Sequence, residues 1–361
     1  MSNIKYNLID RTEPVVLKEN LGFGNHFTDH VFEMDYTPEK GWHNAIITRL
    51  DKLEFHHATT FMHYGQTIFE GLKAYYTPNG EIQLFRPEKN MERLNKSAKR
   101  LCMPEVDIAF AVEALKELVA IEKDWVPKNY LDSLYVRPFM IGTDSLLGVK
   151  PSTAYKFIIL LSPVGAYYPE GFKPIKIMIQ EDYVRAVRKG LGECKTAANY
   201  ASSLLGAEIA RKMGYTQCLW LDAVELKYIE EVGTMNIFIR FNDEVATPAL
   251  TGGILHGITR LSTIQLLKDM GYNLVERLIS VDELVSRYEK GEVLEVFGTG
   301  TAAVISSVGE IKFRDNILKL TKDNQPGELA TKLFDELSGI QRGTIPDRHN
   351  WIQKVDVEVT A

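Results

Sequence analysis

Cysteine, positive charge and long apolar runs are all scarce in this sequence. Its 361 residues include three cysteines, Cys102, Cys194 and Cys218, whose spacing fits neither a zinc site nor a redox dithiol. The 42 basic residues are outnumbered by 48 acidic ones, for a formal net charge of −6, so neutralisation of nucleic-acid phosphates is not expected. The longest apolar run, residues 157–161, is far shorter than the roughly 20 residues that cross a bilayer. We therefore expect no metal site, no nucleic-acid partner and no membrane segment.

The rest of the composition is that of an average globular protein. Hydrophobic residues make up 45% and charged residues 25% of the chain, and a chain of this length is typical of two domains. Residues 1–14 mix acidic and basic side chains without an apolar core, which does not fit a secretory signal or a transit peptide. We expect a cytoplasmic, enzyme-sized protein.

Hydrophobic periodicity predicts a mixture of helices and strands. Amphipathic helices are expected near residues 90–101 and from an N-cap at Asp107 onward. Two later helices should end at Gly214 and Gly271, and Ser280 opens a capping box with Glu283. Strands rich in β-branched and aromatic residues are expected at 134–141, 155–161, 175–179, 218–221, 228–231, 236–241 and 274–279. Because strands and helices do not alternate regularly, the fold class is predicted to be α+β.

The sequence also suggests where one domain ends. Residues 162–171 concentrate proline, glycine and tyrosine, a composition typical of an irregular connection. We predict a small N-terminal domain at 1–162, an interdomain loop at 163–174 and a larger C-terminal domain at 175–361, each combining helices and strands.

One glycine-rich segment predicts an anion site. Residues 251–257, with the sequence TGGILHG, precede a clear helical pattern that begins at Ile258. Backbone N–H groups at a helix N-terminus favour a bound anion such as a phosphate. An ordinary glycine-rich turn is the alternative.

A second glycine-rich segment, Gly298 to Ala303, matches the GxGxxA pattern of dinucleotide-binding proteins. We reject that interpretation, because too little chain follows for such a domain and residues 304–308 resemble a strand. What is left is a tight turn whose amides at Thr301 and Ala302 are suited to a carboxylate or a phosphate.

Single residues are less informative. His26 and His30 have helical i,i+4 spacing, but their surroundings do not form a helix pattern, so a structural role is favoured over metal binding. Lys195 precedes a helix that we expect to be amphipathic through Leu204 and Leu205. Its pattern alone does not separate it from an ordinary solvated lysine.

Taken together, these segments resemble the branched-chain amino-acid aminotransferases, pyridoxal-phosphate enzymes of fold type IV, and specifically the group that includes the animal enzymes. The resemblance covers nearly the whole chain. It depends on FEGLKA at 69–74, SLYVRP at 133–138, Lys195 with Asn199 and Tyr200, EVGTMNIF at 231–238 and VFGTGTA at 296–302.

The resemblance implies a site for pyridoxal 5′-phosphate. Lys195 would form the Schiff base with the cofactor and act as the catalytic proton carrier. Glu231 would keep the pyridine nitrogen protonated, so that the ring accepts electrons, and Tyr200 would contact the 3′-oxygen. The other cofactor contacts that it implies are Arg93, Thr234, Ile258, Thr259 and Thr301. The Ile258 and Thr259 positions coincide with the anion site inferred from the glycines.

It also implies a substrate pocket. Thr301 and Ala302 would bind the substrate carboxylate, and Arg137 with the tyrosine hydroxyls would hold the distal carboxylate of glutamate. The aromatic wall that favours a branched aliphatic side chain would consist of Phe23, Tyr64, Phe69, Tyr135 and Tyr167.

The implied activity is reversible, ping-pong transfer of the amino group of L-leucine, L-isoleucine or L-valine to 2-oxoglutarate, by a homodimer. The animal enzymes carry a Cys-x-x-Cys pair where this chain has Ala303 and Ser306, so thiol regulation of that kind is not expected. The alternatives are a D-amino-acid aminotransferase, an aminodeoxychorismate-type lyase, a nicotinamide dehydrogenase and a noncatalytic binding module.

Overall fold

The computed structural model describes residues 3–166, 172–321 and 323–357 and divides into two compact units. The first unit contains Met1–Tyr167, Cys194–Ala197 and Gly339–Ala361, and the second contains Tyr168–Glu193 and Ala198–Ser338. Lys195 thus belongs to the first unit, although the expected C-terminal domain includes it. The predicted loop at 163–174 stays a prediction, since residues 167–171 are outside the described part.

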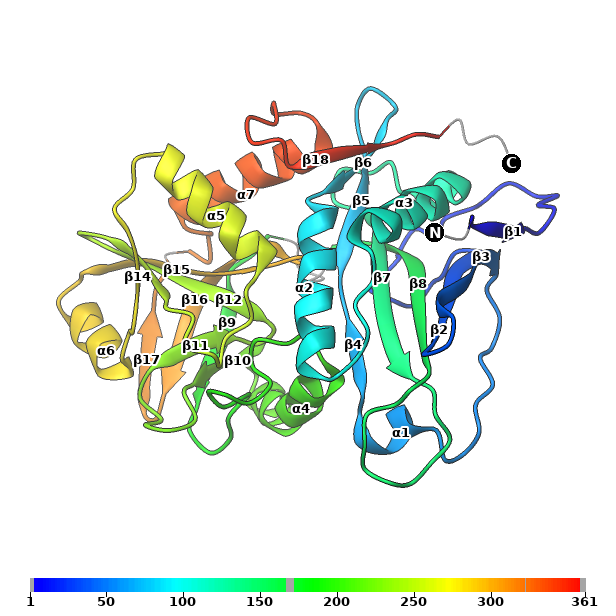
Figure 1. Ribbon diagram of the computed structural model, residues 1–361. Coiled ribbons are helices and arrows are strands. Elements are labelled where there is room, and N and C mark those ends of the chain that lie inside the picture. The colour runs from blue at the N-terminus through cyan, green and yellow to red at the C-terminus, as the bar shows by residue number, and fades with distance from the viewer. Residues whose placement is uncertain (1–2, 167–171, 322, 358–361) are drawn as a thin grey trace. The chain divides into compact units, whose positions relative to one another are not determined.

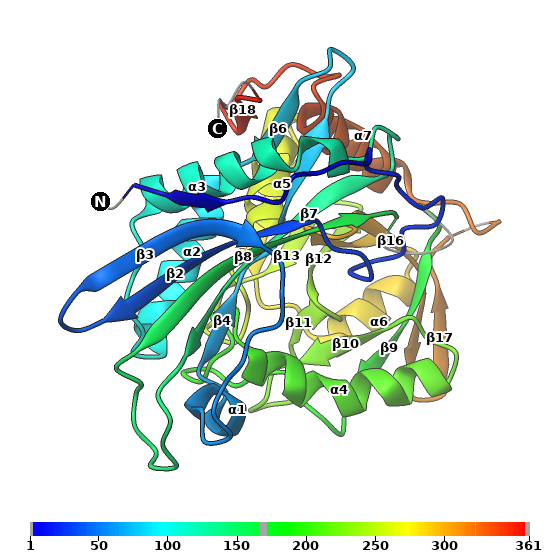
Figure 2. The ribbon, with the colours of Figure 1, turned by 90° about the vertical axis from the view of Figure 1, so that its right-hand side faces the viewer.

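The first unit is built on one large sheet (Figures 1 and 2). Its strand order is β1(Lys5–Asn7), β3(Gly41–Arg49), β2(His30–Thr37), β8(Tyr155–Val164), β7(Ser133–Gly142), β5(Leu72–Tyr76), β6(Ile82–Phe85) and β18(Ile352–Val355), with β4(Thr67–Phe69) paired to β7. The helices of this unit are α1(Thr60–Tyr64), α2(Pro87–Arg100) and α3(Ile108–Ile121), with a short 3₁₀ turn at Lys123–Trp125.

The two faces of this sheet have different roles. Leu134 and Val136 of β7 lie in the hydrophobic core together with residues of α2 and α3. Since side chains alternate along a strand, Tyr135 and Arg137 point to the opposite face. The helices therefore cover one face, and candidate substrate-binding residues occupy the other.

Helix α2 is more deeply buried than its amphipathic pattern predicts. Its apolar side is in the core, with Leu94 fully buried, but the polar residues Asn90, Arg93 and Ser97 are buried as well. Buried polar groups need hydrogen-bond partners, and the partners of these three side chains build part of the candidate site. Helix α3 begins at the predicted cap, where the Asp107 carboxylate accepts the Phe110 N–H at 2.8 Å.

The second unit contains a sheet that is partly closed. Its strand order is β11(Ile229–Val232), β10(Gln217–Leu221), β9(Ile175–Gln180), β16(Val304–Phe313), β15(Val293–Gly300), β12(Met235–Phe241), β13(Val245–Pro248) and β14(Leu274–Arg277), with β17(Asn316–Lys319) paired to β16. Because β11 also pairs with β12, the strands from β11 to β12 form a barrel-like ring. The remaining helices are α4(Ala197–Lys212), α5(Ile258–Asp269), α6(Val281–Glu289) and α7(Glu328–Arg342). The predicted α+β class is confirmed.

The expectation for α4 is wrong in one respect. Leu204 and Leu205 are 68% and 53% exposed, and the helix instead buries its small residues Gly206 and Ala210. A Cβ atom at position 206 would come within 2.7 Å of the Trp220 ring. Close approach to this tryptophan, and not an apolar stripe, decides which side of α4 faces the sheet. The helix still ends as predicted, with Gly214 at φ +82°.

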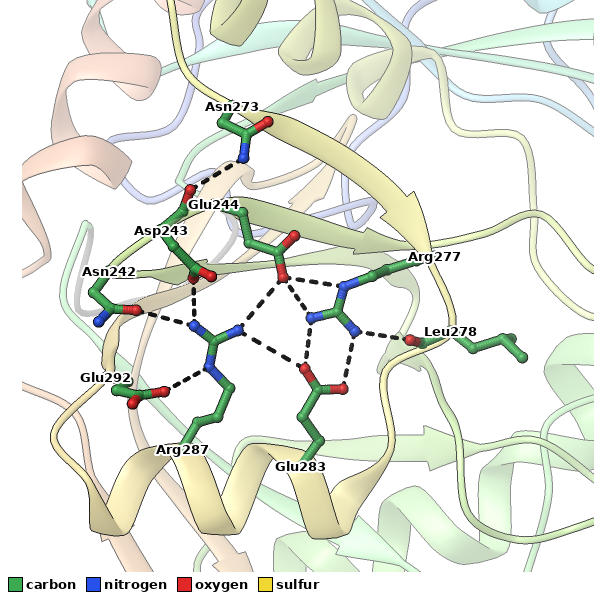
Figure 3. A network of polar contacts seen from close by, with 9 residues as sticks. All are labelled: Asn242, Asp243, Glu244, Asn273, Arg277, Leu278, Glu283, Arg287 and Glu292. Carbon is green, nitrogen blue, oxygen red and sulfur yellow. Dashed lines mark hydrogen bonds and ion pairs between the residues drawn. The ribbon is translucent and has the colours of Figure 1, made fainter.

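A network of ion pairs ties α6 to the sheet of the second unit (Figure 3). Arg277, at the end of β14, donates to Glu244 beside β13 and to Glu283 on α6. Arg287 on α6 donates to Glu292 at 3.0 Å and also pairs with Asp243. These carboxylates raise the pKa of Arg277 above its usual value, Glu283 most strongly.

A membrane-spanning helix must be both long and apolar. Within the described part of the chain, no helix has the length and hydropathy needed to cross a bilayer.

Candidate active site

The segment that carries Lys195 is fixed to the first unit by an isolated β-bridge between Thr196 and Ile68. Phe69 donates its N–H to the Lys195 carbonyl at 3.0 Å, and Thr196 donates its hydroxyl to the Thr67 carbonyl at 2.7 Å. The Lys195 N–H is bound in turn by the Ser97 hydroxyl on α2, at 3.0 Å. The Lys195 Nζ lies 4.9 Å from the centre of the Phe69 ring. The backbone of this lysine is therefore held on both sides, and its amine lies against an aromatic face.

Arg93 is bound by a carboxylate that the sequence reasoning did not single out. Glu70 is fully buried and accepts hydrogen bonds from Arg93 Nε and Nη2 at 2.7 and 2.8 Å. It also accepts one from Asn90 at 2.8 Å. The buried polar side of α2 thus orients the guanidinium predicted to bind phosphate, and Ser97, one turn further along, contacts Lys195.

Most of the predicted substrate residues of the first unit form one cluster. The Arg137 guanidinium carbon lies 4.8 Å from the centre of the Phe69 ring and 5.3 Å from that of Tyr135. Arg137 also donates to the Tyr135 hydroxyl at 3.1 Å, and the Phe23 and Tyr135 rings are 5.0 Å apart. Gly71 gives this hydroxyl its space, because a Cβ atom there would overlap it. The cluster offers an aromatic wall with one cation.

The other two predicted aromatic residues differ from these in what the structure describes. Tyr64, at the end of α1, is 43% exposed and donates its hydroxyl to the Leu147 carbonyl. Tyr167 lies outside the described residues.

In the second unit, a β-bulge places the Glu231 carboxylate. Trp220 pairs with Glu231 and Leu221 with Ile229, so Glu230 is an extra residue in β11. Glu231 is buried, and its Oε2 lies 3.1 Å from Arg185 Nε. Its Oε1 accepts the Leu255 N–H at 2.7 Å. The carboxylate predicted to face the pyridine nitrogen is therefore positioned by a buried arginine and by the glycine-rich loop.

The glycine-rich loop leads into α5 as predicted. Its last residue, Gly257, is the N-cap of α5 and provides no side-chain cap. A Cβ atom at Gly257 would overlap the Asn236 amide oxygen, whose amide nitrogen donates to the Leu255 carbonyl at 3.0 Å. Ile258 and Thr259 are the first residues of the helix, so their N–H groups are at its positive end. This local geometry suits a phosphate.

The other predicted residues of the second unit lie at strand and helix ends. Thr301 and Ala302 form the turn between β15 and β16, and Thr234 lies exposed in the turn between β11 and β12. Tyr200 lies in the first half of α4. The expectation that residues 304–308 form a strand is confirmed by β16, which excludes the helix that a dinucleotide fingerprint needs there.

Glu70, Ser97 and Arg185 are the residues of this site that the sequence reasoning missed. Each is a polar residue in an ordinary strand, helix or loop pattern, and its partner is distant in the sequence. The one available signal was the i,i+3 and i,i+7 spacing of Asn90, Arg93 and Ser97, which puts them on one side of α2.

Comparison with known proteins identifies the family of the chain. Residues 67–311 match the amino-transferase class IV family. The chain is 50% identical to Branched-chain-amino-acid aminotransferase 2 of Bacillus subtilis, over 98% of this chain and 97% of that protein. It is 44% identical to the branched-chain-amino-acid aminotransferase of Mycolicibacterium smegmatis, over 93% of each. The crystal structure of the Escherichia coli branched-chain amino acid aminotransferase matches with a TM-score of 0.77 and 27% identity, over 91% of this chain and all of that one.

A further solved structure bears on the cofactor. A branched-chain amino acid aminotransferase from T.th., solved with pyridoxamine 5′-phosphate, matches with a TM-score of 0.76 and 25% identity, over 92% of this chain and all of that one. The family match covers more than half of the chain and includes Arg93, Lys195 and Glu231. The chain belongs to the class IV aminotransferases.

Proposed function

We propose that this protein catalyses the reversible transfer of the amino group of L-leucine, L-isoleucine or L-valine to 2-oxoglutarate. The observation that carries the proposal is the placement of Lys195, whose backbone is bound by Phe69 and Ser97 while its amine lies on the Phe69 ring. The near full-length likeness to branched-chain-amino-acid aminotransferases supports the choice of substrate. Arg137 and the aromatic residues around it suit both an aliphatic and an acidic side chain.

We propose pyridoxal 5′-phosphate as the cofactor, and the residues present fit its chemistry. A phosphate needs cationic and N–H donors, which Arg93 and the first turn of α5 offer. A protonated pyridine nitrogen needs a buried carboxylate, which Glu231 offers. When bound, this cofactor supplies an electron sink that makes the α-proton of an amino acid acidic and carries the amino group between the substrates.

The proposed roles of the chain's own groups follow from this chemistry. Lys195 would hold the cofactor aldehyde through its Nζ until the substrate amine takes its place, and the released amine would then move the proton at the substrate Cα. Glu231 holds the proton on the ring nitrogen, and Tyr200 donates to the ring oxygen. Thr301 and Ala302 bind the substrate carboxylate with backbone N–H groups. The other proposed cofactor contacts are Thr234, Ile258 and Thr259, and the other proposed substrate contacts are Phe23, Tyr64, Tyr135 and Tyr167.

A direct assay tests the activity. Purified protein is incubated with L-leucine and 2-oxoglutarate, with and without added pyridoxal 5′-phosphate, and L-glutamate is measured. Rapid formation of glutamate supports the proposal. Double-reciprocal plots of the initial rate against one substrate, at several fixed concentrations of the other, should give parallel lines. D-Alanine and aminodeoxychorismate as substrates test the two related activities of the fold, and preference for either would contradict the proposal.

We also propose that the protein acts as a cytoplasmic homodimer, as the family resemblance implies. Sedimentation of the purified protein tests the dimer, and a monomeric species with full activity would contradict it. Fractionation of the source cells tests the location.

A further inference from the structure

The β-bulge in β11 brings two consecutive carboxylates into one buried environment. Neighbouring side chains of a regular strand point to opposite faces, but the extra residue of a bulge changes this alternation. Glu230 and Glu231 are both only 3% exposed. Glu231 forms an ion pair with Arg185 and accepts a hydrogen bond from the Leu255 N–H. Glu230 Oε2, in contrast, has no hydrogen-bond partner among the described residues.

One arginine contacts both Glu231 and the glycine-rich loop on which Glu230 packs. Arg185 is buried, lies 3.1 Å from Glu231 through its Nε and donates its Nη2 to the Gly253 carbonyl. The Glu230 carboxylate packs directly on Gly253, where a Cβ atom would overlap it. A charge on Glu230 therefore acts on the same guanidinium and the same loop that position Glu231.

We propose that Glu230 is a positioning residue for Glu231, which acts through Arg185 and the loop at 251–257. When Glu230 is protonated, Glu231 is the carboxylate of this pair whose charge is balanced by Arg185. When Glu230 is ionised, an additional negative charge lies beside Glu231 and also attracts the guanidinium that Glu231 binds. This inference depends on the proposed function, because Glu231 is taken to face the ring nitrogen of the cofactor.

Glu230 is the group of this cluster that changes charge near neutral pH. Burial raises its pKa to about 7, with Glu231 and Asp222 adding to the rise while Arg185 and Arg188 oppose it. The other charged groups nearby are already bound. Arg188 pairs with Glu225 at 3.0 Å, and four backbone N–H groups hold the Asp222 carboxylate.

A cavity next to Glu230 gives a path for its proton. The cavity has a volume of about 130 Å³, and its lining includes Arg188, Asp222, Glu225, Tyr228 and Glu230. Apolar side chains, among them Ile254 and Leu278, line the rest of the cavity. Its volume is large enough for water molecules, which the charged groups at Glu230 and Asp222 can bind. Glu230 can therefore exchange its proton without unfolding of β11.

The test compares the pH dependence of the cofactor absorption spectrum in three holoenzymes. Wild type is compared with Glu230→Gln, which keeps the shape without the charge, and with Glu225→Gln, which removes another carboxylate of the same cavity. We expect the wild-type spectrum between roughly pH 5.5 and 9 to contain a component with a midpoint near pH 7. The Glu225→Gln protein should keep this component, and the Glu230→Gln protein should lose it.

Thermal unfolding of the same proteins over the same pH range gives a second readout. The Tm difference between Glu230→Gln and wild type should grow in favour of the variant as the pH rises toward 7 and level off above it. Over that range the unfolded wild type releases the Glu230 proton while the folded protein still holds it, and above it both states are ionised. Glu230→Thr, which also removes the charge and suits a strand, replaces Glu230→Gln if that variant does not fold.

The outcomes separate this inference from the proposed function. A protein that binds no pyridoxal 5′-phosphate, and so shows no cofactor band, would overturn the proposed function and this inference with it. A normal band whose pH dependence is the same in wild type and the Glu230 variant would overturn the inference alone. Loss of the component in Glu225→Gln as well would also overturn it, because the effect would then belong to the cavity as a whole.

Discussion

Arg93 and Glu70 face each other through two parallel hydrogen bonds, from Nε to Oε1 at 2.7 Å and from Nη2 to Oε2 at 2.8 Å. Both side chains are buried, at 7% and 0% exposure. A paired arrangement of this kind fixes the plane of the guanidinium. The arginine proposed to bind the cofactor phosphate is therefore oriented by the protein itself.

Removal of Glu70 should be strongly destabilising. Glu70→Ala leaves Arg93 charged and buried without its carboxylate, which costs about 3–5 kcal/mol. Urea unfolding of the variant measures this loss. The matched control is Glu92→Ala, which breaks the exposed pair of Lys89 and Glu92 on the same helix and should cost at most about 0.5 kcal/mol. Similar losses in the two variants would contradict the importance of the buried pair.

Lys195 should be the residue that borohydride reduction links to the cofactor. Reduction of the holoenzyme, digestion and mass spectrometry identify the modified peptide. Lys73 provides an internal control, since burial lowers its pKa to about 7 and so leaves a large share of its amine unprotonated at neutral pH. Label on Lys195 alone supports its proposed role, and label on Lys73 instead would contradict it.

Parts of the structure that depend on local sequence could be predicted. The Asp107 cap and the stops at Gly214 and Gly271 appear where their patterns indicate, with both glycines at positive φ. The start of α5 at Ile258, where we propose an anion site, also required only a glycine-rich segment and a helical period. These features are decided by a few neighbouring residues.

The remaining parts depend on contacts that are distant in the sequence. Helix α7, the β2–β3 hairpin and the short strands β4 to β6 were not predicted. The exposure of Leu204 depends on the close packing of Gly206 against Trp220, and the bulge at Glu230 depends on the register with β10. Neither the Glu70–Arg93 pair nor the Arg185–Glu231 pair has a local signal, because each joins two separate elements.

Arg137 should determine recognition of the acidic substrate more than that of the aliphatic one. Its guanidinium lies between Phe69 and Tyr135, and its Nε is buried without a hydrogen-bond partner among the described residues. Arg137→Met keeps the apolar stem but removes the charge. Loss of a charged hydrogen bond of about 1.5–3 kcal/mol predicts a rise of roughly 10–100-fold in KM for 2-oxoglutarate. Steady-state kinetics check this, and an equal rise for L-leucine would contradict the assignment.

Asp222 should contribute stability that is lost in acid. Hydrogen bonds from backbone N–H groups lower its pKa to about 2, against the opposing effect of burial. Because the folded pKa is below the unfolded one, the contribution is present above about pH 4 and disappears as the pH falls toward 2. Asp222→Asn should cost about 1–2 kcal/mol at pH 7 and progressively less below about pH 4. Urea unfolding at pH 7 and below about pH 4 measures the loss of stability in Asp222→Asn. A loss that does not depend on pH would mean that the charge of the Asp222 carboxylate plays no part.

The ion-pair network around Arg277 should stabilise the second unit more than an isolated surface pair does. In Figure 3 this guanidinium lies between Glu244 and Glu283 and joins the end of β14 to α6. Because its partners are already held by a second arginine, Arg287, less side-chain entropy is lost in each contact. Arg277→Ala should therefore destabilise the protein by about 1 kcal/mol at low salt, and less at about 1 M salt, where the Debye length falls to about 3 Å.

Arg211→Ala, which removes an exposed pair with Glu208 on α4, should have no measurable effect in the same unfolding experiment. An Arg277 effect that is insensitive to salt would indicate lost packing on the Phe241 ring, 5.8 Å from the guanidinium carbon, and not lost charge.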